Sequence, residues 1–405
     1  MRNKVSLIAA GHRRVISGLL RCHLIIAVLL LPAAAQAEGI DTSARQAILM
    51  DYDTGTVLFE KNAHERMAPS SMSKLMTLNM LFEELKDGRV KLTDRFPVSE
   101  HAWRTGGAAT DGSTMFAALG SSIPVEDLIR GVAVQSGNDA AIVIAEGLGG
   151  TEAEFAQMMN RWAKELGLNE SHFMNATGLP DPDHYMTAHD LAVLARHLIK
   201  DLGQYYHYFS ETEFMWNKVK QQNRDPLLYL GMGADGLKTG HTRVGGFGLT
   251  SSAIRKGQRF IVVVNGLQTV KARSSEPRRL LEYAFREFKS YELFAANAKV
   301  DSAEVWRGQI DSVPLVTAEP VRVGMLRSAR PKMRVSVRYE APIAAPIEKG
   351  QRIGTLEVVI PGTEKTTFPL LAGKSIERAG VVGDLLDTAL YLIDRQFAEK
   401  EASLP

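Results

Sequence analysis

The stretch that decides the fold is MAPSSMSKLMT, residues 67–77, which places three serines directly before a lysine. The serines are Ser70, Ser71 and Ser73, and the lysine is Lys74. Ser71 and Lys74 have the spacing S-x-x-K, and residues three apart lie on one face of a helix. A neutral lysine amine in that place can accept the serine's proton. The alternative is a capped helix that carries a surface lysine, and Ser70, after Pro69, is expected as the N-cap.

Two further motifs follow along the chain. SGN at residues 136–138 fits S-x-N and lies between two helical patterns, and KTG at residues 238–240 lies on an expected strand. Each short motif alone is common by chance. All three in this order, each on the expected element, favour a nucleophilic serine over a capped helix.

These motifs closely resemble those of the low-molecular-mass penicillin-binding proteins, the serine D-alanyl-D-alanine carboxypeptidases. The resemblance includes GSTMF, SGNDAA, GLP, HYMTAHDLA and the GHT that follows Lys238, and it covers nearly all of the mature chain. It implies a mixed α/β (α+β) catalytic domain, in which an antiparallel sheet packs with a helical cluster, then a small all-β domain and a C-terminal amphipathic helix. It implies peptidoglycan stem peptides ending in D-Ala-D-Ala as substrates, and β-lactams as covalent inhibitors.

The resemblance also implies a role for each motif residue. Ser71 attacks the carbonyl of the penultimate D-Ala, and Lys74, as a neutral amine, accepts the hydroxyl proton. Ser136 relays a proton to the departing D-Ala, and Asn138 holds a substrate amide. The backbone N–H groups of Ser71 and His241 receive the developing oxyanion. No cofactor and no metal ion is expected.

Cationic residues are expected around the substrate's terminal carboxylate. Lys238 and Thr239 lie close to it, with Gly240 next on the same strand, and the charge of Lys238 helps to keep Lys74 neutral. Arg273 matches the family's carboxylate-binding arginine, a task that suits the planar guanidinium. A solvated loop arginine is the alternative at this position.

Hydrophobic periodicity divides the chain after its first 37 residues. Residues 38–293 begin with two short strands, continue with helical patterns and return to three strands, which predicts a mixed domain closed by a helix over 276–291. Within this domain the Gly-rich segment 104–115 is predicted as a surface loop. Residues 294–377 alternate in short strands with Pro and Gly between them, which predicts a smaller β domain.

The N-terminal segment has the pattern of an export signal. Residues 1–37 carry five basic residues and no acidic one, then a short apolar run and the sequence Ala35-Gln36-Ala37. We expect cleavage after Ala37 and a location in the periplasm or at the outer face of the cytoplasmic membrane. Cleavage changes the formal net charge from +2 to −3 and removes Cys22, the one cysteine of the chain. Disulfides and a nucleic-acid footprint are therefore not expected.

The C-terminal segment 378–405 has apolar residues at helical spacing, which predicts an amphipathic helix. Such a helix in the resembling family lies on the membrane, and we expect peripheral membrane association through residues 380–400. Its polar face is more acidic than basic, unlike most interfacial helices. Packing on its own domain or on a partner is the alternative.

Three other functions share parts of this pattern. A class A β-lactamase uses a glutamate in the context E-x-x-L-N, and residues 165–169 read ELGLN, but Gly167 is expected to end a helix there. A D,D-endopeptidase or transpeptidase shares the fold and the chemistry. A peptidoglycan-binding protein without activity would keep the fold, but the intact motifs argue against it.

Overall fold

The computed structural model describes residues 2–7, 40–361, 363 and 365–380. The chain forms two compact units, Gly39–Lys289 and a second unit of Met1–Glu38 with Ser290–Pro405. The boundary lies a few residues before the one expected at 293. The predicted C-terminal helix lies outside the described residues.

The first unit contains a five-stranded antiparallel sheet in the order β3-β2-β10-β9-β8. Both ends of the segment therefore contribute strands to one sheet, as the sequence predicts. β2 and most of β10 are buried along their length, because helices cover both faces of the sheet. The strands are β2 (Gln46–Asp51), β3 (Val57–Lys61), β8 (Ala234–Thr242), β9 (Gly246–Arg255) and β10 (Gln258–Leu267).

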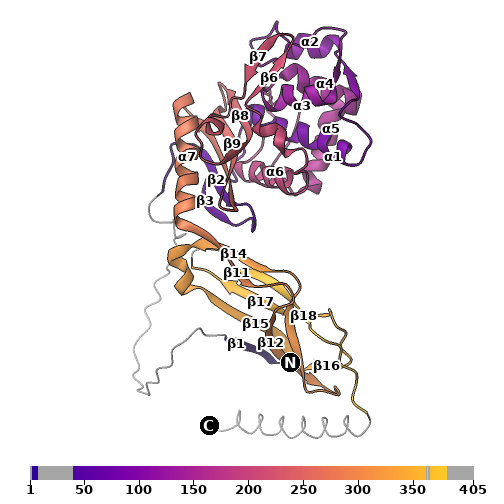
Figure 1. The fold of residues 1–405 in the computed structure, drawn as a ribbon, viewed down its shortest axis with the longest axis vertical. Coiled ribbons are helices and arrows are strands. Elements are labelled where there is room, and N and C mark those ends of the chain that lie inside the picture. The colour runs from indigo at the N-terminus through magenta and orange to yellow at the C-terminus, as the bar shows by residue number, and fades with distance from the viewer. Residues whose placement is uncertain (1, 8–39, 362, 364, 381–405) are drawn as a thin grey trace. The chain divides into compact units, whose positions relative to one another are not determined.

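The helices of this unit lie mainly between β3 and β8 in the chain. Figure 1 shows them gathered on one side of the sheet, with α7 along the other. They are the 3-10 turn η1 (Ser70–Ser73), α1 (Lys74–Lys86), α2 (Glu100–Gly106), α3 (Val125–Ala133), α4 (Asn138–Gly149), α5 (Glu152–Glu165), α6 (Ala188–Lys200) and α7 (Val270–Glu287). Three short elements complete the helical side: the two-stranded ribbon β4 (Arg95–Pro97) with β5 (Ser122–Pro124), and the 3-10 turns η2 (Tyr206–Ser210) and η3 (Pro226–Tyr229).

Side-chain caps begin several of these helices. Thr151 accepts a hydrogen bond from Glu154 N at the start of α5, and Thr187 accepts one from Asp190 N at the start of α6. α5 ends at Glu165, and Gly167 follows with φ +75°. Glu165 is thus an exposed helix-terminal residue, and the predicted end of the helix at Gly167 is confirmed.

α1 is the central helix of the unit. All of its residues except Glu84 and Lys86 are buried, among them Leu75, Met76 and Phe82 with no exposed surface. Its first residue, Lys74, is also fully buried. A lysine is almost never fully buried unless it is paired, so the start of α1 carries an electrostatic cost.

Some local predictions were wrong. The closing helix begins at Val270, six residues before the expected start, and its C-terminal end gives way to the strand β11 (Phe288–Phe294). Arg273 therefore lies on a helix and not in a loop. The hairpin of β6 (Glu213–Trp216) and β7 (Val219–Gln222) was not expected, because its turn residues are Asn-Lys and lack the usual glycine.

The second unit is a β domain, as predicted. Its main sheet has the order β1-β15-β17-β18-β13-β12-β16, and β11 pairs with β14 separately. Residues of the predicted export signal form β1 (Arg2–Leu7), antiparallel to β15. The other strands are β12 (Lys299–Trp306), β13 (Ser312–Thr317), β14 (Val321–Leu326), β15 (Arg334–Ala341), β16 (Ile343–Ala344), β17 (Arg352–Val359) and β18 (Thr366–Ala372), with the 3-10 turn η4 (Arg327–Lys332).

Candidate active site

The three serines of the opening stretch have different environments. Ser70 and Ser73 are 1% and 0% exposed, whereas Ser71 is partly exposed. The Ser71 Oγ lies 2.9 Å from the Lys74 Nζ. Ser71 is therefore the serine that both faces the lysine and has access to solvent, as the S-x-x-K spacing predicts.

The expected role of Ser70 as a helix N-cap was wrong. Its backbone has φ +52°, whereas N-cap residues are usually extended, and η1 has no side-chain cap. The Ser70 hydroxyl instead shares a hydrogen bond of 2.9 Å with the Thr242 hydroxyl. Ser70 thus links η1 to the end of β8.

The buried amine of Lys74 has three partners. Its Nζ lies 2.7 Å from Asn138 Oδ1, 2.6 Å from the Thr177 carbonyl oxygen and 2.9 Å from Ser71 Oγ. The first two are oxygens that can only accept hydrogen bonds. A neutral amine directs its two N–H groups at them, and its lone pair then points at the Ser71 hydroxyl. The geometry fits a base that is ready to take the serine's proton.

The pKa of Lys74 falls from 10.5 to about 7, with burial as the largest cause. The positive charge of Arg224 also lowers it, while the carboxylates of Asp139 and Glu152 act in the opposite direction. The expected helper was Lys238. That lysine is itself 2% exposed, and burial holds its pKa well below the ordinary value, with repulsion from Lys74 as the next cause. Desolvation is therefore the main source of neutrality at Lys74. Arg224 is a contributing cation, and Lys238 and Lys74 repel each other.

The S-x-N motif lies between α3 and α4. Asn138 is the first residue of α4, and its Oδ1 is occupied by Lys74, which leaves its Nδ2 donors for a substrate carbonyl. Ser136 is buried with φ +66°, and the structure shows no hydrogen bond from its hydroxyl to Lys74. The structure thus places Asn138 in direct contact with the amine, and Ser136 lies two residues before it in the chain.

Asp139 is a functional residue that the sequence analysis did not assign. Its carboxylate accepts hydrogen bonds from Thr114 Oγ1 (2.6 Å), Met115 N, Ala117 N and its neighbour Ala140 N. The Gly-rich segment 104–115, expected as a surface loop, is therefore partly buried, and Met115 has no exposed surface. Its first residues belong to α2, which ends at Gly106.

The K-T-G motif lies on β8, as expected. Lys238 and Thr239 are buried, and the ring of His241 stacks on Phe247 at 4.0 Å. Gly240 is required by close packing, because a Cβ there would lie 2.9 Å from the Pro69 carbonyl oxygen. Gly240 therefore allows β8 to lie directly against η1, beside the nucleophile.

Three cations and one acid surround the K-T-G strand. Lys238, Arg224 and Arg273 act electrostatically on one another, and Asp225 attracts both Lys238 and Arg273. The Arg273 Nε is buried and makes no hydrogen bond within the described residues. Burial raises the pKa of Asp225 to about 7, although Leu227 N and Ser251 Oγ donate to it. The net positive charge and the unused guanidinium donor suit a carboxylate ligand.

Arg224 and Asp225 were missed by the sequence analysis. The sequence Asp225-Pro226 is a recognisable start of a helical turn, and Asp225 does accept the capping bond from Leu227 N. That signal predicts a helix cap but not a functional site, because Arg224 and Asp225 come close to β8 and α7 only in the folded chain. Thr177 was also missed, since it contributes a backbone oxygen and no side chain.

Comparison with known families supports this arrangement. The family model described as D-alanyl-D-alanine carboxypeptidase matches residues 32–269, and that of the penicillin-binding protein 5 C-terminal domain matches residues 288–378. The chain is 35% identical over 375 residues to D-alanyl-D-alanine carboxypeptidase DacF of Bacillus subtilis, covering 89% of this chain and 95% of that protein. It is 36% identical over 368 residues to DacC of Escherichia coli, covering 90% and 92%.

Solved structures agree. Penicillin-binding protein 5 of Haemophilus influenzae has a TM-score of 0.78 at 32% identity, over 84% of this chain and 99% of that one. Penicillin-binding protein D2 of Listeria monocytogenes, solved in its ampicillin-bound form, has a TM-score of 0.53 at 28% identity, over 61% and 99%. The site and these matches lead to one conclusion: the chain belongs to the D-alanyl-D-alanine carboxypeptidase family.

Proposed function

We propose that this protein is a serine D-alanyl-D-alanine carboxypeptidase that removes the terminal D-Ala from peptidoglycan stem pentapeptides. One observation carries the proposal: Ser71 Oγ lies 2.9 Å from a buried amine whose other two contacts are carbonyl oxygens. This amine has a pKa of about 7, which suits a base that works at neutral pH. The family match gives the substrate class.

The reaction has two steps. Ser71 Oγ attacks the carbonyl carbon of the penultimate D-Ala, and its proton passes to the Lys74 amine. The backbone N–H groups of Ser71 and His241 stabilise the oxyanion, and they lie on η1 and β8, which pack closely because Gly240 has no side chain. The peptide C–N bond then breaks, and the leaving amine takes the proton from Lys74 by way of Ser136. Water hydrolyses the ester with Lys74 again as base.

The substrate's terminal carboxylate binds among Lys238, Thr239 and Arg273. Lys238 is buried without an ion-pair partner in the described part of the chain, and Arg273 has an unused donor, so both gain from an arriving carboxylate. Asn138 Nδ2 binds a carbonyl of the stem peptide. β-Lactams carry a carboxylate and an acylating carbonyl, so they acylate Ser71 and leave slowly.

Export and membrane association are part of this proposal. Residues 1–37 have the pattern of an export signal, and a periplasmic site gives access to peptidoglycan. Among the described residues, no helix is long and apolar enough to cross a membrane.

The C-terminal segment is proposed to hold the exported protein at the membrane surface. Deleting residues 381–405 is expected to move the protein from the membrane fraction to the soluble fraction, because hydrophobic insertion of the amphipathic segment is lost. Fractionation followed by detection with fluorescent penicillin measures this. Retention of the shortened protein in the membrane fraction contradicts the role.

Replacing the nucleophile separates Ser71 from its neighbour. Ser71→Ala is expected to abolish both acylation by penicillin, seen as the mass of one acyl group, and release of free D-Ala from a pentapeptide. The matched variant Ser70→Ala is expected to be acylated, and to lose about 1 kcal/mol of unfolding free energy with the Thr242 hydrogen bond. Acylation of the Ser71→Ala variant at the wild-type rate would contradict the assignment of Ser71 as the nucleophile.

The acylation rate is expected to depend on pH through Lys74. Because the neutral amine is the active form, the rate constant for penicillin should rise about tenfold per pH unit below pH 7 and level off above it. Lys74→Arg keeps a positive charge at every pH and should lose acylation throughout. Stopped-flow fluorescence between pH 5 and 9 measures this; a flat wild-type profile contradicts it.

Removing the Arg273 guanidinium tests the carboxylate site. Arg273→Ala is expected to raise KM for a D-Ala-D-Ala peptide by about 10- to 100-fold, the range for a lost charge-assisted hydrogen bond. A peptide with a C-terminal amide should be affected much less. Arg278→Ala, on the same helix and paired with Glu282 at the surface, is the control. Equal effects on acid and amide peptides rule out carboxylate binding by Arg273.

A further inference from the structure

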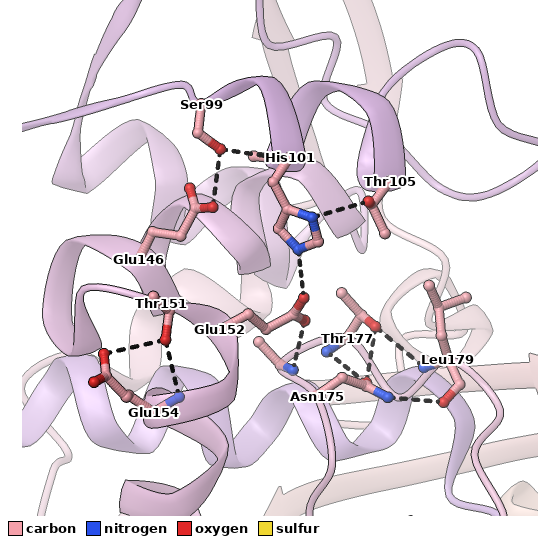
Figure 2. Close-up of polar contacts among 12 residues, drawn as sticks. Ser99, His101, Thr105, Glu146, Thr151, Glu152, Glu154, Asn175, Thr177 and Leu179 are labelled. Atoms are coloured by element: carbon pink, nitrogen blue, oxygen red, sulfur yellow. Dashed lines mark hydrogen bonds and ion pairs between the residues drawn. The ribbon is translucent and has the colours of Figure 1, made fainter.

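The Thr177 carbonyl oxygen is the shortest contact of the catalytic amine, at 2.6 Å from Lys74 Nζ. It is a backbone atom, so its place depends on what holds the segment 175–178. Figure 2 shows the polar contacts around this segment, which involve α2, α5 and the segment itself.

Asn175 organises the segment from within. Its Oδ1 accepts three hydrogen bonds: from Thr177 N (3.1 Å), Thr177 Oγ1 (2.9 Å) and Gly178 N (2.8 Å). Its Nδ2 donates to the Leu179 carbonyl oxygen at 3.1 Å. One amide side chain thus holds the N–H groups before and after Thr177 and the Thr177 hydroxyl. Through these contacts it sets the direction of the Thr177 carbonyl.

The preceding residue, Ala176, is held through both of its backbone polar groups. Glu152, the first residue of α5, accepts from Ala176 N through Oε1 (3.0 Å) and contacts His101 Nε2 through Oε2 (3.0 Å), as Figure 2 shows. On the other side, Thr77 Oγ1 of α1 donates to the Ala176 carbonyl oxygen at 2.7 Å. Thr77 lies three residues after Lys74, so the same helix face holds the segment and presents the amine to it.

The segment also fits closely against the nucleophile's turn. Gly178 has φ +76°, and a Cβ at this position would lie 1.9 Å from the Ser70 carbonyl oxygen and 2.8 Å from Ser73 Oγ. There is no space for the segment to move toward η1. Its position relative to Lys74 is therefore set by Asn175 and Glu152 on one side and by η1 on the other.

We propose that Asn175 and Glu152 are positioning residues for acylation: they hold the Thr177 carbonyl against the Lys74 amine, so that the lone pair of the neutral amine points at Ser71. Without the Thr177 acceptor, one N–H of the amine has no fixed partner and the amine rotates. Glu152 has a second effect, because its carboxylate favours the protonated amine. This inference rests on the proposed roles of Ser71 and Lys74.

Acylation by fluorescent penicillin, followed by stopped flow from pH 5 to 9, tests the proposal with four variants. Asn175→Ala removes the three acceptor contacts and should lower the plateau rate by about 10- to 100-fold, the cost of misplacing a reacting group by about 1 Å. The affinity of the non-covalent complex should not change. Asn175→Asp keeps the acceptor oxygen and should restore most of the plateau.

The near-isosteric variants Asn175→Asp and Glu152→Gln should shift the acid limb, the rising low-pH side of the pH–rate profile, in opposite directions. Asn175→Asp adds a carboxylate near Lys74, so the limb moves to higher pH. Glu152→Gln keeps an acceptor for Ala176 N but removes the charge, so the limb moves to lower pH. The other groups coupled electrostatically to Lys74 are Asp139, Arg224, Lys238 and His184, and all stay in place, as does His101, which contacts Glu152.

Asn160→Ala is the matched control. Asn160 bonds the backbone of Phe173 through both side-chain atoms, two residues before the segment, and does not contact Thr177. It should lower stability while leaving the plateau and the acid limb in place. This separates loss of positioning from a general loss of stability.

Four outcomes decide the matter. A folded Asn175→Ala protein with the wild-type plateau overturns the proposal, and so does an acid limb that stays in place in Glu152→Gln. If Asn175→Ala does not fold, Asn175→Asp and Glu152→Gln decide by their opposite shifts. If wild-type protein is not acylated on Ser71 at all, the proposed function fails instead, which is a distinct result.

Discussion

The burial of one amine is the constraint on which the rest of the site depends. Lys74 is fully buried at the start of α1, and its pKa falls from 10.5 to about 7. At neutral pH this costs on the order of 4–5 kcal/mol of folding free energy, at 1.36 kcal/mol per pKa unit. Between about pH 7 and 10.5 the unfolded chain binds a proton here that the folded chain does not, so this group makes stability rise with pH in that range.

The fold gives this amine defined contacts in three directions. η1 presents the Ser71 hydroxyl, α4 presents the Asn138 carboxamide, and the segment before α6 presents the Thr177 carbonyl oxygen. Asp139, near the start of α4, holds the segment around Met115 through a hydrogen bond. β8 lies close to η1 because Gly240 has no side chain. Ser70 and Ser136 both have positive φ, a conformation that costs about 1–3 kcal/mol and is typical of functional sites. The large apolar core around α1 offsets these costs.

The sequence predicts the elements and the first contact of the site. Helical spacing places Ser71 beside Lys74, and hydrophobic periodicity predicts three strands, the first of which carries K-T-G. It does not predict Thr177, because a backbone acceptor leaves no residue-type signal. It also does not predict Arg224 or Asp225, since their contacts join segments far apart in the chain. The role of Ser70 was misjudged because its backbone turns left-handed, which no local pattern reveals.

A direct titration of the Lys74 amine tests the central claim. NMR of protein with isotope-labelled lysine side chains follows each amine through pH, and the Lys74→Arg variant assigns the signal. The account predicts one lysine with a midpoint near pH 7 that is absent from the variant. A Lys74 midpoint near the ordinary value of 10.5 would contradict it, because the amine would then be protonated at neutral pH and unable to accept the Ser71 proton.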